Sequence, residues 1–195
     1  MNIKDYIAAW GDQWWPASQP VWTLPSQVPM LIKQRLAQRS NEYIIRDEMA
    51  IHHSAVIEPS AVLKGRGWIG AGCFIAAHTY LRGGVILLDH VIIGPGCELK
   101  SSIVFSHTTL AHFNFVGDSI IGSHVNVEAG AVIANHYNER EDKAIHVRLS
   151  EGVIATGVTK FGAVVGDRCK IGANAVLSPG TVLTAATVVG RLQLV

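Results

Sequence analysis

The sequence predicts an all-β fold, a parallel β-helix built from six-residue repeats, and three observations point to it. An aliphatic residue returns at every sixth position from Ile45 onward. Glycine often follows that residue, as in Ile69-Gly70 and Ile93-Gly94. Hydrophobic residues make up 49% of the 195-residue chain and charged residues only 16%. This composition excludes a disordered chain and indicates a folded protein that buries most of its residues.

The period of six is neither that of a helix nor that of an ordinary strand. A helix would return apolar residues at spacings of three and four, and a half-buried strand at every second residue. In a hexapeptide repeat each unit is a short strand plus a tight corner, three units complete a coil, and coils stack about 4.8 Å apart. The residues in phase, expected to point into the lumen, are Ile45, Ile51, Ile57, Leu63, Ile69, Ile75, Leu81, Leu87, Ile93, Leu99, Phe105 and Ala111, then after a two-residue slip Phe115, Ile121, Val127 and Ile133, and finally Val153, Thr159, Val165, Ile171, Leu177, Leu183 and Val189.

Two segments break this period. Residues 1–44 hold four of the five tryptophans among several prolines, and residues 26–39 predict a helix with Ser26 as its N-cap. This segment is expected either to be a helical cap that covers the open first coil or to form an aromatic binding surface. The β-helix is expected over residues 45–195, with the charged run 138–150 leaving it as a surface loop. That loop is either a solvated insertion or a lid against a neighbouring subunit.

Composition also bears on partners and location. No run of 18 apolar residues occurs, and the first residues lack the apolar stretch of a signal peptide, so neither membrane insertion nor secretion is expected. The formal net charge is +1, so nucleic acid is not an expected partner. Cys73, Cys97 and Cys169 are odd in number and lack C-x-x-C spacing, which indicates small buried thiols in a reducing, cytoplasmic compartment.

Polar residues between the repeats carry a family resemblance. They are the runs 82–84 (RGG), 97–100 (CELK) and 112–118 (HFNFVGD). At these runs the chain resembles the acetyltransferase domain of N-acetylglucosamine-1-phosphate uridyltransferase, and at residues 117–122 (GDSIIG) it resembles related two-domain sugar-1-phosphate nucleotidyltransferases. The resemblance implies a left-handed parallel β-helix, a homotrimer with active sites between adjacent prisms, and acyl transfer from acetyl-CoA to a sugar phosphate.

The resemblance also implies roles for individual residues. His112 falls on the family's catalytic histidine, which takes a proton from the acceptor amine as that amine attacks the thioester. A neutral imidazole suits this role because its reference pKa is about 6.5. Ala129 falls where a backbone N–H would stabilise the oxyanion. The residues that would bind the acceptor are Arg82, Lys100, Phe115, Asn126, Asn135, His136 and Lys160, with Arg82 and Lys100 on its phosphate.

Three departures from the family pattern concern the acceptor. Phe115 and His136 stand where the family has tyrosines, so two hydroxyls are missing. Lys160, in the run 160–167 (KFGAVVGD) that resembles a later family motif, follows Asn135 after 25 positions, where the family spacing is short. The nucleotidyl-transfer domain is not expected, because residues 1–44 carry no G-x-G-T-R signature.

Two other functions would keep the same fold. Because the hydroxyls are missing, the first is a non-catalytic protein that binds a sugar phosphate or a nucleotide sugar, or serves as a scaffold. The second is a zinc site like that of β-helical carbonic anhydrases, since His107 and His112 are five apart and His78 and His90 lie on earlier coils. Zinc needs three protein ligands and an open position. The surrounding residues resemble the sugar acetyltransferase instead, so no metal is expected.

Overall fold

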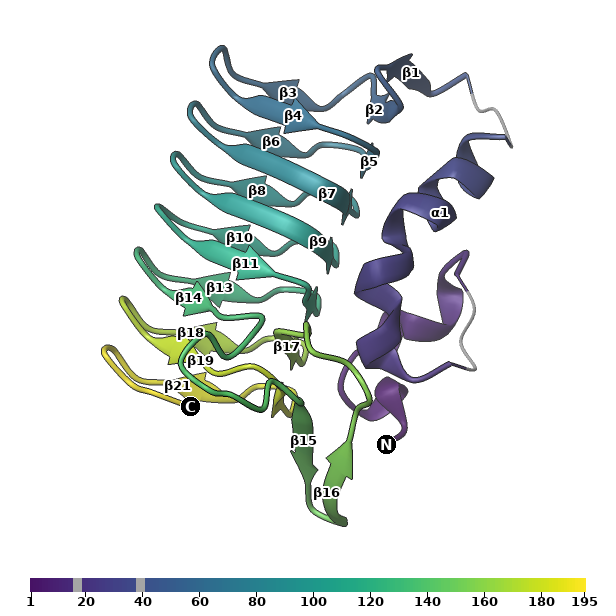
Figure 1. The fold of residues 1–195 in the computed structure, drawn as a ribbon. Helices are drawn as coiled ribbons and strands as arrows, with labels where there is room; N and C mark the ends of the chain where they lie inside the picture. Colours follow the sequence, from purple (N-terminus) through teal and green to yellow (C-terminus); the bar gives the residue numbers. More distant parts are fainter. Residues whose placement is uncertain (16–18, 38–40) are drawn as a thin grey trace.

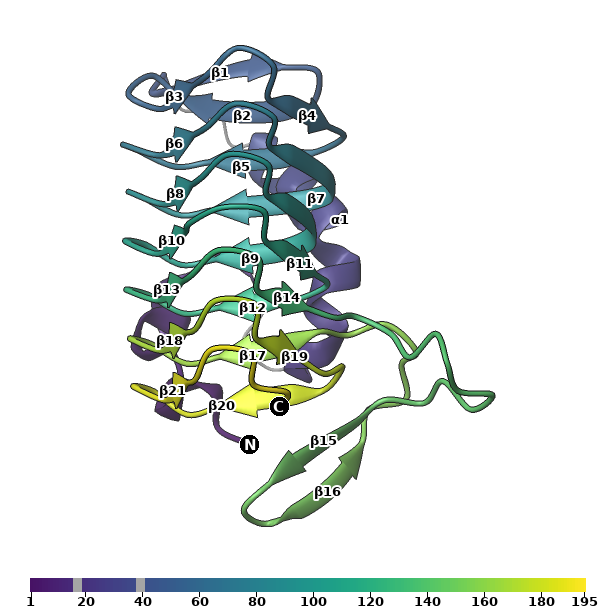
Figure 2. The same ribbon diagram turned by 90° about the vertical axis from the view of Figure 1, so that its left-hand side faces the viewer.

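A computed structural model gives the fold at residues 1–15, 19–37 and 41–195, and its main body is a parallel β-helix (Figure 1). Short strands stack in parallel, each paired with the strands of the neighbouring coils (Figure 2). An N-terminal helical segment lies alongside the stack. The parallel β-helix predicted from the hexapeptide period, together with a short N-terminal helix, is therefore confirmed.

The β-helix has three faces, numbered here in chain order within a coil. Face 1 contains β2 (Met49–His52), β5 (Gly67–Ile69), the ends of β7 (Tyr80–Leu87) and β9 (Glu98–Val104), β12 (Ile120–Ile121), β17 (Ala163–Val165) and β20 (Thr181–Leu183). Face 2 contains β3 (Val56–Ile57), β6 (Phe74–Ile75), β8 (Ile92–Ile93), β10 (Thr109–Leu110), β13 (Asn126–Val127), β18 (Lys170–Ile171) and β21 (Val188–Val189). Face 3 contains β4 (Val62–Lys64), the beginnings of β7 and β9, β11 (Phe115–Gly117), β14 (Val132–Ile133) and β19 (Val176–Leu177). Because β7 and β9 continue around a corner, faces 3 and 1 belong to one sheet.

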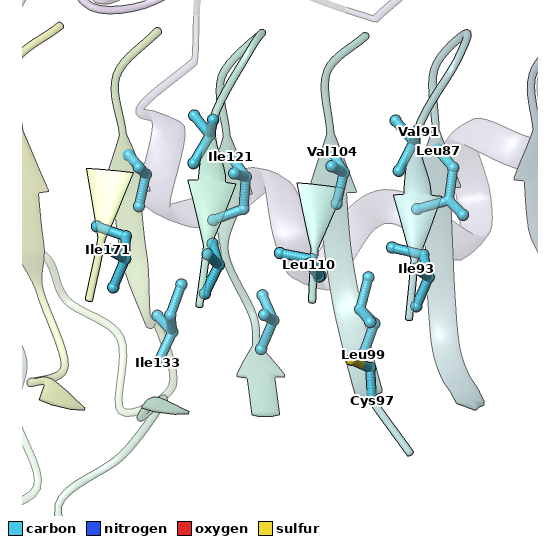
Figure 3. Close-up of a cluster of buried hydrophobic side chains, with 14 of the residues drawn as sticks. Leu87, Val91, Ile93, Cys97, Leu99, Val104, Leu110, Ile121, Ile133 and Ile171 are labelled. Atoms are coloured by element: carbon cyan, nitrogen blue, oxygen red, sulfur yellow. The ribbon is translucent and has the colours of Figure 1, made fainter. Parts of the chain in front are cut away.

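Aliphatic side chains fill the lumen of the β-helix (Figure 3). On face 2, for example, Ile93 pairs with Leu110 and both are fully buried. Burying an aliphatic side chain of this size contributes about 1.5–3 kcal/mol. The glycine after Ile93 is needed for the next coil to approach, since a Cβ on Gly94 would lie 1.5 Å from the carbonyl oxygen of Ala111.

The coils change length, which corrects the predicted phase. Leu81 pairs with Leu99, 18 residues later, but Leu99 pairs with Val116, only 17 residues later. The register shift lies at the corner between faces 3 and 1, where the two glycines Gly83 and Gly84 are opposed by Ser101 alone. A strict period of six therefore fails from this corner onward.

Several residues predicted to be in the lumen consequently lie elsewhere. Val104, Leu110 and Val116 fill the lumen in place of the predicted Phe105, Ala111 and Phe115. The predicted first repeat is also wrong, because Ile45 is exposed in β1 (Tyr43–Arg46), which pairs antiparallel with β2. Val153 and Thr159 are exposed too, because the chain has left the β-helix there. The other predicted positions line the lumen or pack against it.

The N-terminal segment covers face 1 rather than the open first coil. It consists of three 3₁₀ turns, η1 (Ile3–Asp5), η2 (Ala8–Asp12) and η3 (Val21–Thr23), followed by α1 (Leu24–Leu36). It packs against the outward side chains of face 1, which are apolar in successive coils, among them Ile86, Ile103 and Val164. This apolar face would otherwise be exposed, so the helix lies along the stack and the expectation of a cap over the first coil is wrong.

The ends of α1 differ from the prediction. The N-cap is Thr23, and the Ser26 hydroxyl donates to the Thr23 carbonyl at 2.8 Å instead of capping a free N–H. Pro25 is tolerated in the first turn, where an N–H has no intrahelical acceptor. The predicted C-terminal residue, Arg39, lies outside the described residues. No helix in the described ranges has the length and apolarity to cross a bilayer.

Two tryptophans of the N-terminal segment are core residues. Their burial favours a packing role for this segment over the alternative of an aromatic binding surface. Trp10 and Trp15 are 3% and 4% exposed. Their ring centroids lie 6.0 Å and 5.8 Å from that of Phe105, which is fully buried. Phe105 thus joins the N-terminal segment to the β-helix from outside the lumen.

Residues 136–160 leave the β-helix as a projecting segment, called the hairpin arm below (Figure 2). Within it, β15 (His146–Leu149) and β16 (Gly152–Ala155) form an antiparallel hairpin. The chain returns beside the point where it left, because the Phe161 N–H donates to the Asn135 carbonyl at 2.9 Å. The charged run 138–150 lies within this arm, and its end forms the strand β15.

Replacing Phe105 with alanine should destabilise the protein strongly. The substitution leaves a cavity between Trp10 and Trp15, and Phe→Ala in a core costs about 3–5 kcal/mol. Denaturant unfolding followed by tryptophan fluorescence would measure the free energy of unfolding. Met30→Ala is the control, because Met30 is 51% exposed on α1 and its loss should change that energy by about 0.5 kcal/mol or less.

The three thiols should resist alkylation in the native state. Cys73, Cys97 and Cys169 are buried and free, and burial raises the pKa of each, for Cys73 to about 11. At pH 8 about one Cys73 side chain in a thousand is then the reactive thiolate. Mass spectrometry after iodoacetamide treatment should find no rapid modification at pH 8 until denaturant is added. Rapid native modification of any of the three would contradict the burial described here.

Candidate active site

His112 and Ala129 occupy equivalent positions on consecutive coils, at the corner between faces 2 and 3. The Gly130 N–H donates to the His112 carbonyl at 2.8 Å, which aligns the two turns. The His112 side chain is exposed and makes no side-chain hydrogen bond within the described part of the chain. Its imidazole is therefore accessible to a ligand.

The Ala129 N–H has no acceptor among the described residues. At the same corner of other coils, the Ala77 N–H donates to Glu58 at 2.7 Å and the Ala173 N–H donates to Glu128 at 2.9 Å. The residue that would supply this carboxylate to Ala129 is Ala111, which has no acceptor in its side chain. An unpaired N–H thus lies one coil from the accessible imidazole, and such a donor suits an oxyanion.

Glu128, next to Ala129, is held by a different set of contacts. Arg191 donates from Nε and Nη2 to its two carboxylate oxygens at 2.9 Å and 3.2 Å. The Arg191 guanidinium and the Ala173 N–H hold the pKa of Glu128 below its usual range. The lowered pKa makes Glu128 a weaker proton acceptor, and Arg191 and the Ala173 N–H already occupy its two oxygens.

A second group of predicted residues lies on face 3 and its corner with face 1. Lys100 forms an ion pair with the buried Asp118, Nζ to Oδ2 at 2.6 Å, and the amide of Asn135 donates to the same Asp118 oxygen. The guanidinium of Arg82 pairs with Glu98 at 2.7 Å. Both predicted phosphate-binding cations are thus neutralised by carboxylates of the chain itself.

Phe115, His136 and Lys160 lie around this second group. Phe115 is half-buried on β11, paired in register with Glu98. His136 contacts Asn135, with Nδ1 3.2 Å from Oδ1. Lys160 is exposed where the hairpin arm returns beside Asn135. The arm therefore accounts for the long separation of Asn135 and Lys160 in the sequence, and it brings Lys160 back near Asn135 in space.

The predicted site residues form two groups rather than one. His112 and Ala129 are at the corner of faces 2 and 3, and Asn126 is exposed on β13 of face 2. The group around Lys100 lies across face 3. No hydrogen bond or ion pair joins the two groups within the described ranges.

The histidines of the zinc alternative are also separated. His107 and His112 flank the two ends of β10. His107 instead stacks on His90 and His124, with ring centroids 5.0 Å and 4.9 Å apart, at the corner of faces 1 and 2. Across the described residues, no three His, Cys, Asp or Glu side chains converge as metal ligands.

Sequence reasoning did not identify the acidic partners of the site. Asp118 and Glu98 lie in the runs 112–118 and 97–100, but their roles depend on which residues of the neighbouring coil lie beside them. Lys100 and Asp118 are 18 residues apart, and Arg82 and Glu98 are 16 residues apart. A search for opposite charges within one or two residues of the coil length would have found both pairs.

Comparisons with known proteins agree with the repeat. The family model "Bacterial transferase hexapeptide (six repeats)" matches residues 66–101. A bifunctional sugar-1-phosphate nucleotidylyltransferase/acetyltransferase of Sulfurisphaera tokodaii is 29% identical over 95% of this chain and 46% of its own length. The bifunctional protein GlmU of Methanococcus vannielii is 34% identical over 63% of this chain and 29% of its own length. An uncharacterized acetyltransferase of Escherichia coli O6:K15:H31, YaiX, is 28% identical over 91% of this chain and 80% of its own length.

The chain spans less than half the length of the two bifunctional relatives. These relatives, the matched repeats and the β-helix confirm the resemblance seen in the motifs. The chain is a hexapeptide-repeat protein that resembles acyltransferases of this repeat type.

Proposed function

We propose that this protein transfers an acyl group from an acyl-CoA, with acetyl-CoA as the expected donor, to a sugar or amino-sugar phosphate. The observation that carries the proposal is the pair formed by the exposed, unbonded His112 imidazole and the unpaired Ala129 N–H on the next coil. A base and an oxyanion donor held on consecutive coils are the two groups that acyl transfer needs. The acetyltransferase relatives support the same chemistry.

In the proposed reaction His112 is the general base. The acceptor amine or hydroxyl attacks the thioester carbonyl while the imidazole takes its proton. The carbonyl oxygen becomes an oxyanion that accepts a hydrogen bond from the Ala129 N–H. Collapse of this intermediate breaks the carbon–sulfur bond, and the imidazolium returns the proton to the departing CoA thiolate.

The acceptor is proposed to bind across face 3, toward Arg82, Lys100 and Asn135. Because Arg82 and Lys100 are already paired with Glu98 and Asp118, a phosphate must displace or share these carboxylates. Asp118 contacts both Lys100 and Asn135, so it is a positioning residue for two acceptor contacts. Asn126, Phe115, His136 and Lys160 complete the proposed acceptor set.

A homotrimer would bring the two groups of residues together between subunits. Face 1 is covered by the N-terminal segment, whereas faces 2 and 3 are not. Their outward side chains include exposed apolar residues, with Phe113 72%, Val188 69% and Val62 52% exposed. Packing through these faces would bury this apolar surface and place His112 of one subunit near face 3 of a neighbour. The proposed location is the cytoplasm, where buried free thiols stay reduced.

Replacing His112 with glutamine should abolish most acyl transfer. General-base catalysis contributes about 10²–10⁴-fold, so kcat should fall by that order with little change in KM. CoA thiol release with acetyl-CoA and a panel of amino-sugar phosphates would measure it. The control is His124→Gln, another exposed corner histidine, which should keep full activity. If the wild-type protein binds an acceptor but releases no thiol, the non-catalytic alternative replaces this proposal.

Replacing Asp118 with asparagine should weaken acceptor binding more than turnover. The φ of Asp118 is 45°, in the left-handed region that asparagine tolerates, so the variant keeps the backbone and the side-chain shape. It removes the carboxylate that holds Lys100 and Asn135 in place. KM for a phosphorylated acceptor should rise several-fold while kcat stays within about twofold. Asp167→Asn, at a different corner, is the matched control and should leave both constants unchanged. An equal loss of kcat and kcat/KM would contradict the positioning role.

A further inference from the structure

We propose that the hairpin arm carries a second anion-binding site, which takes the phosphate group of a ligand. The site consists of Tyr137, Arg140, His146 and Arg148, which line two adjoining cavities of the arm. The first cavity, about 330 Å³, lies within the arm, and the second, about 360 Å³, lies between the arm and residues 178–182 of the last coil. Tyr137, His146 and Arg148 line both.

Strand alternation places two of the basic side chains together. In β15, Val147 is buried while His146 and Arg148 are exposed, so these two point to the same side of the hairpin. The last coil approaches the strand closely at Gly180, whose φ is +87° and where a Cβ would lie 2.4 Å from the His146 carbonyl oxygen. Glycine at this position therefore lets the coil form the second wall of the cavity.

Tyr137 connects the arm to the last coil and holds the third basic side chain. Its hydroxyl donates to the Pro179 carbonyl at 3.0 Å. The Arg140 guanidinium carbon lies 3.4 Å from the centre of the Tyr137 ring. Stacking of this kind engages the flat face of a guanidinium and leaves the N–H donors at its edge available to an anion. One of these donors, Nε, lies 3.7 Å from Oε1 of Glu139 in an exposed ion pair, which a phosphate would share or displace.

The charge lining the cavities has one sign. The ionisable basic side chains are Arg140, His146 and Arg148, and neither Glu141 nor Asp142 of the arm lines either cavity. Asp142 instead accepts from the Ala144 N–H at 2.9 Å. Arg148 has no ion pair within the described residues, in contrast to Arg82 and Lys100. Two arginines that converge on one cavity favour a phosphate, which accepts paired N–H donors.

Two ligands of the proposed reaction could supply this phosphate. One is the acyl-CoA donor, through its phosphorylated nucleotide, and the other is an acceptor that carries a phosphate or a nucleoside diphosphate. The assignment of these two sources rests on the proposed function, but anion binding itself does not. Binding is therefore measured without acyl transfer.

Isothermal titration calorimetry of the full chain would test the site with two probes, adenosine 3′,5′-bisphosphate for the donor and UDP for the acceptor. At least one probe should bind the wild-type protein, and Arg148→Gln should weaken that binding about tenfold or more. Arg168→Gln, an exposed arginine at another corner, is the matched control and should change it less than about twofold. Arg140→Gln provides a second variant if Arg148→Gln does not fold.

The probe whose binding the arginine variants weaken identifies the source of the phosphate, and weakened binding of either probe supports the site. The site is refuted if neither probe binds, or if both arginine variants bind as tightly as the wild type. His112→Gln should bind the probes normally even if it has lost acyl transfer. A failure of the proposed function and a failure of this site therefore give different results.

Discussion

Hydrogen bonding between equivalent residues of successive coils is the interaction on which the rest of this structure depends. Every strand of faces 2 and 3 pairs in parallel with the coil before or after it, and the lumen is filled only when the aliphatic residues keep that register. The close approach of coils leaves no room for a Cβ at Gly94. The same register places His112 beside Ala129 and Arg82 beside Lys100, so the candidate site is a direct product of the stacking.

Departures from perfect repetition give the stack its individual features. One residue fewer at the corner of faces 3 and 1 turns Phe105 out of the lumen, where it meets Trp10 and Trp15. At the corner of faces 2 and 3, the absence of a carboxylate at Ala111 leaves the Ala129 N–H unpaired, although its counterparts Ala77 and Ala173 are paired. In both places a single residue that departs from the repeat changes the contacts of the residues around it.

The ion pairs on face 3 also join residues of neighbouring coils. Arg82 and Lys100 are paired with carboxylates one coil away or nearly so, which makes face 3 a set of satisfied ion pairs. Of the two arginines of the hairpin arm, Arg148 has no ion pair within the described residues, and Arg140 has one long, exposed pair with Glu139 at 3.7 Å. Binding of a phosphorylated ligand would therefore break two short ion pairs at face 3 but only this one exposed pair at the arm.

Periodicity and local motifs are enough to predict the β-helix and the family resemblance that singles out His112, because an aliphatic residue every six positions has few other ways to be buried. The position of the N-terminal helix on face 1, the entry of Val104 instead of Phe105 into the lumen and the return of Lys160 beside Asn135 are visible only in the folded molecule. The same holds for Asp118, which contacts both Lys100 and Asn135. These features depend on the length of a corner or on contacts between distant segments, and a local pattern encodes neither.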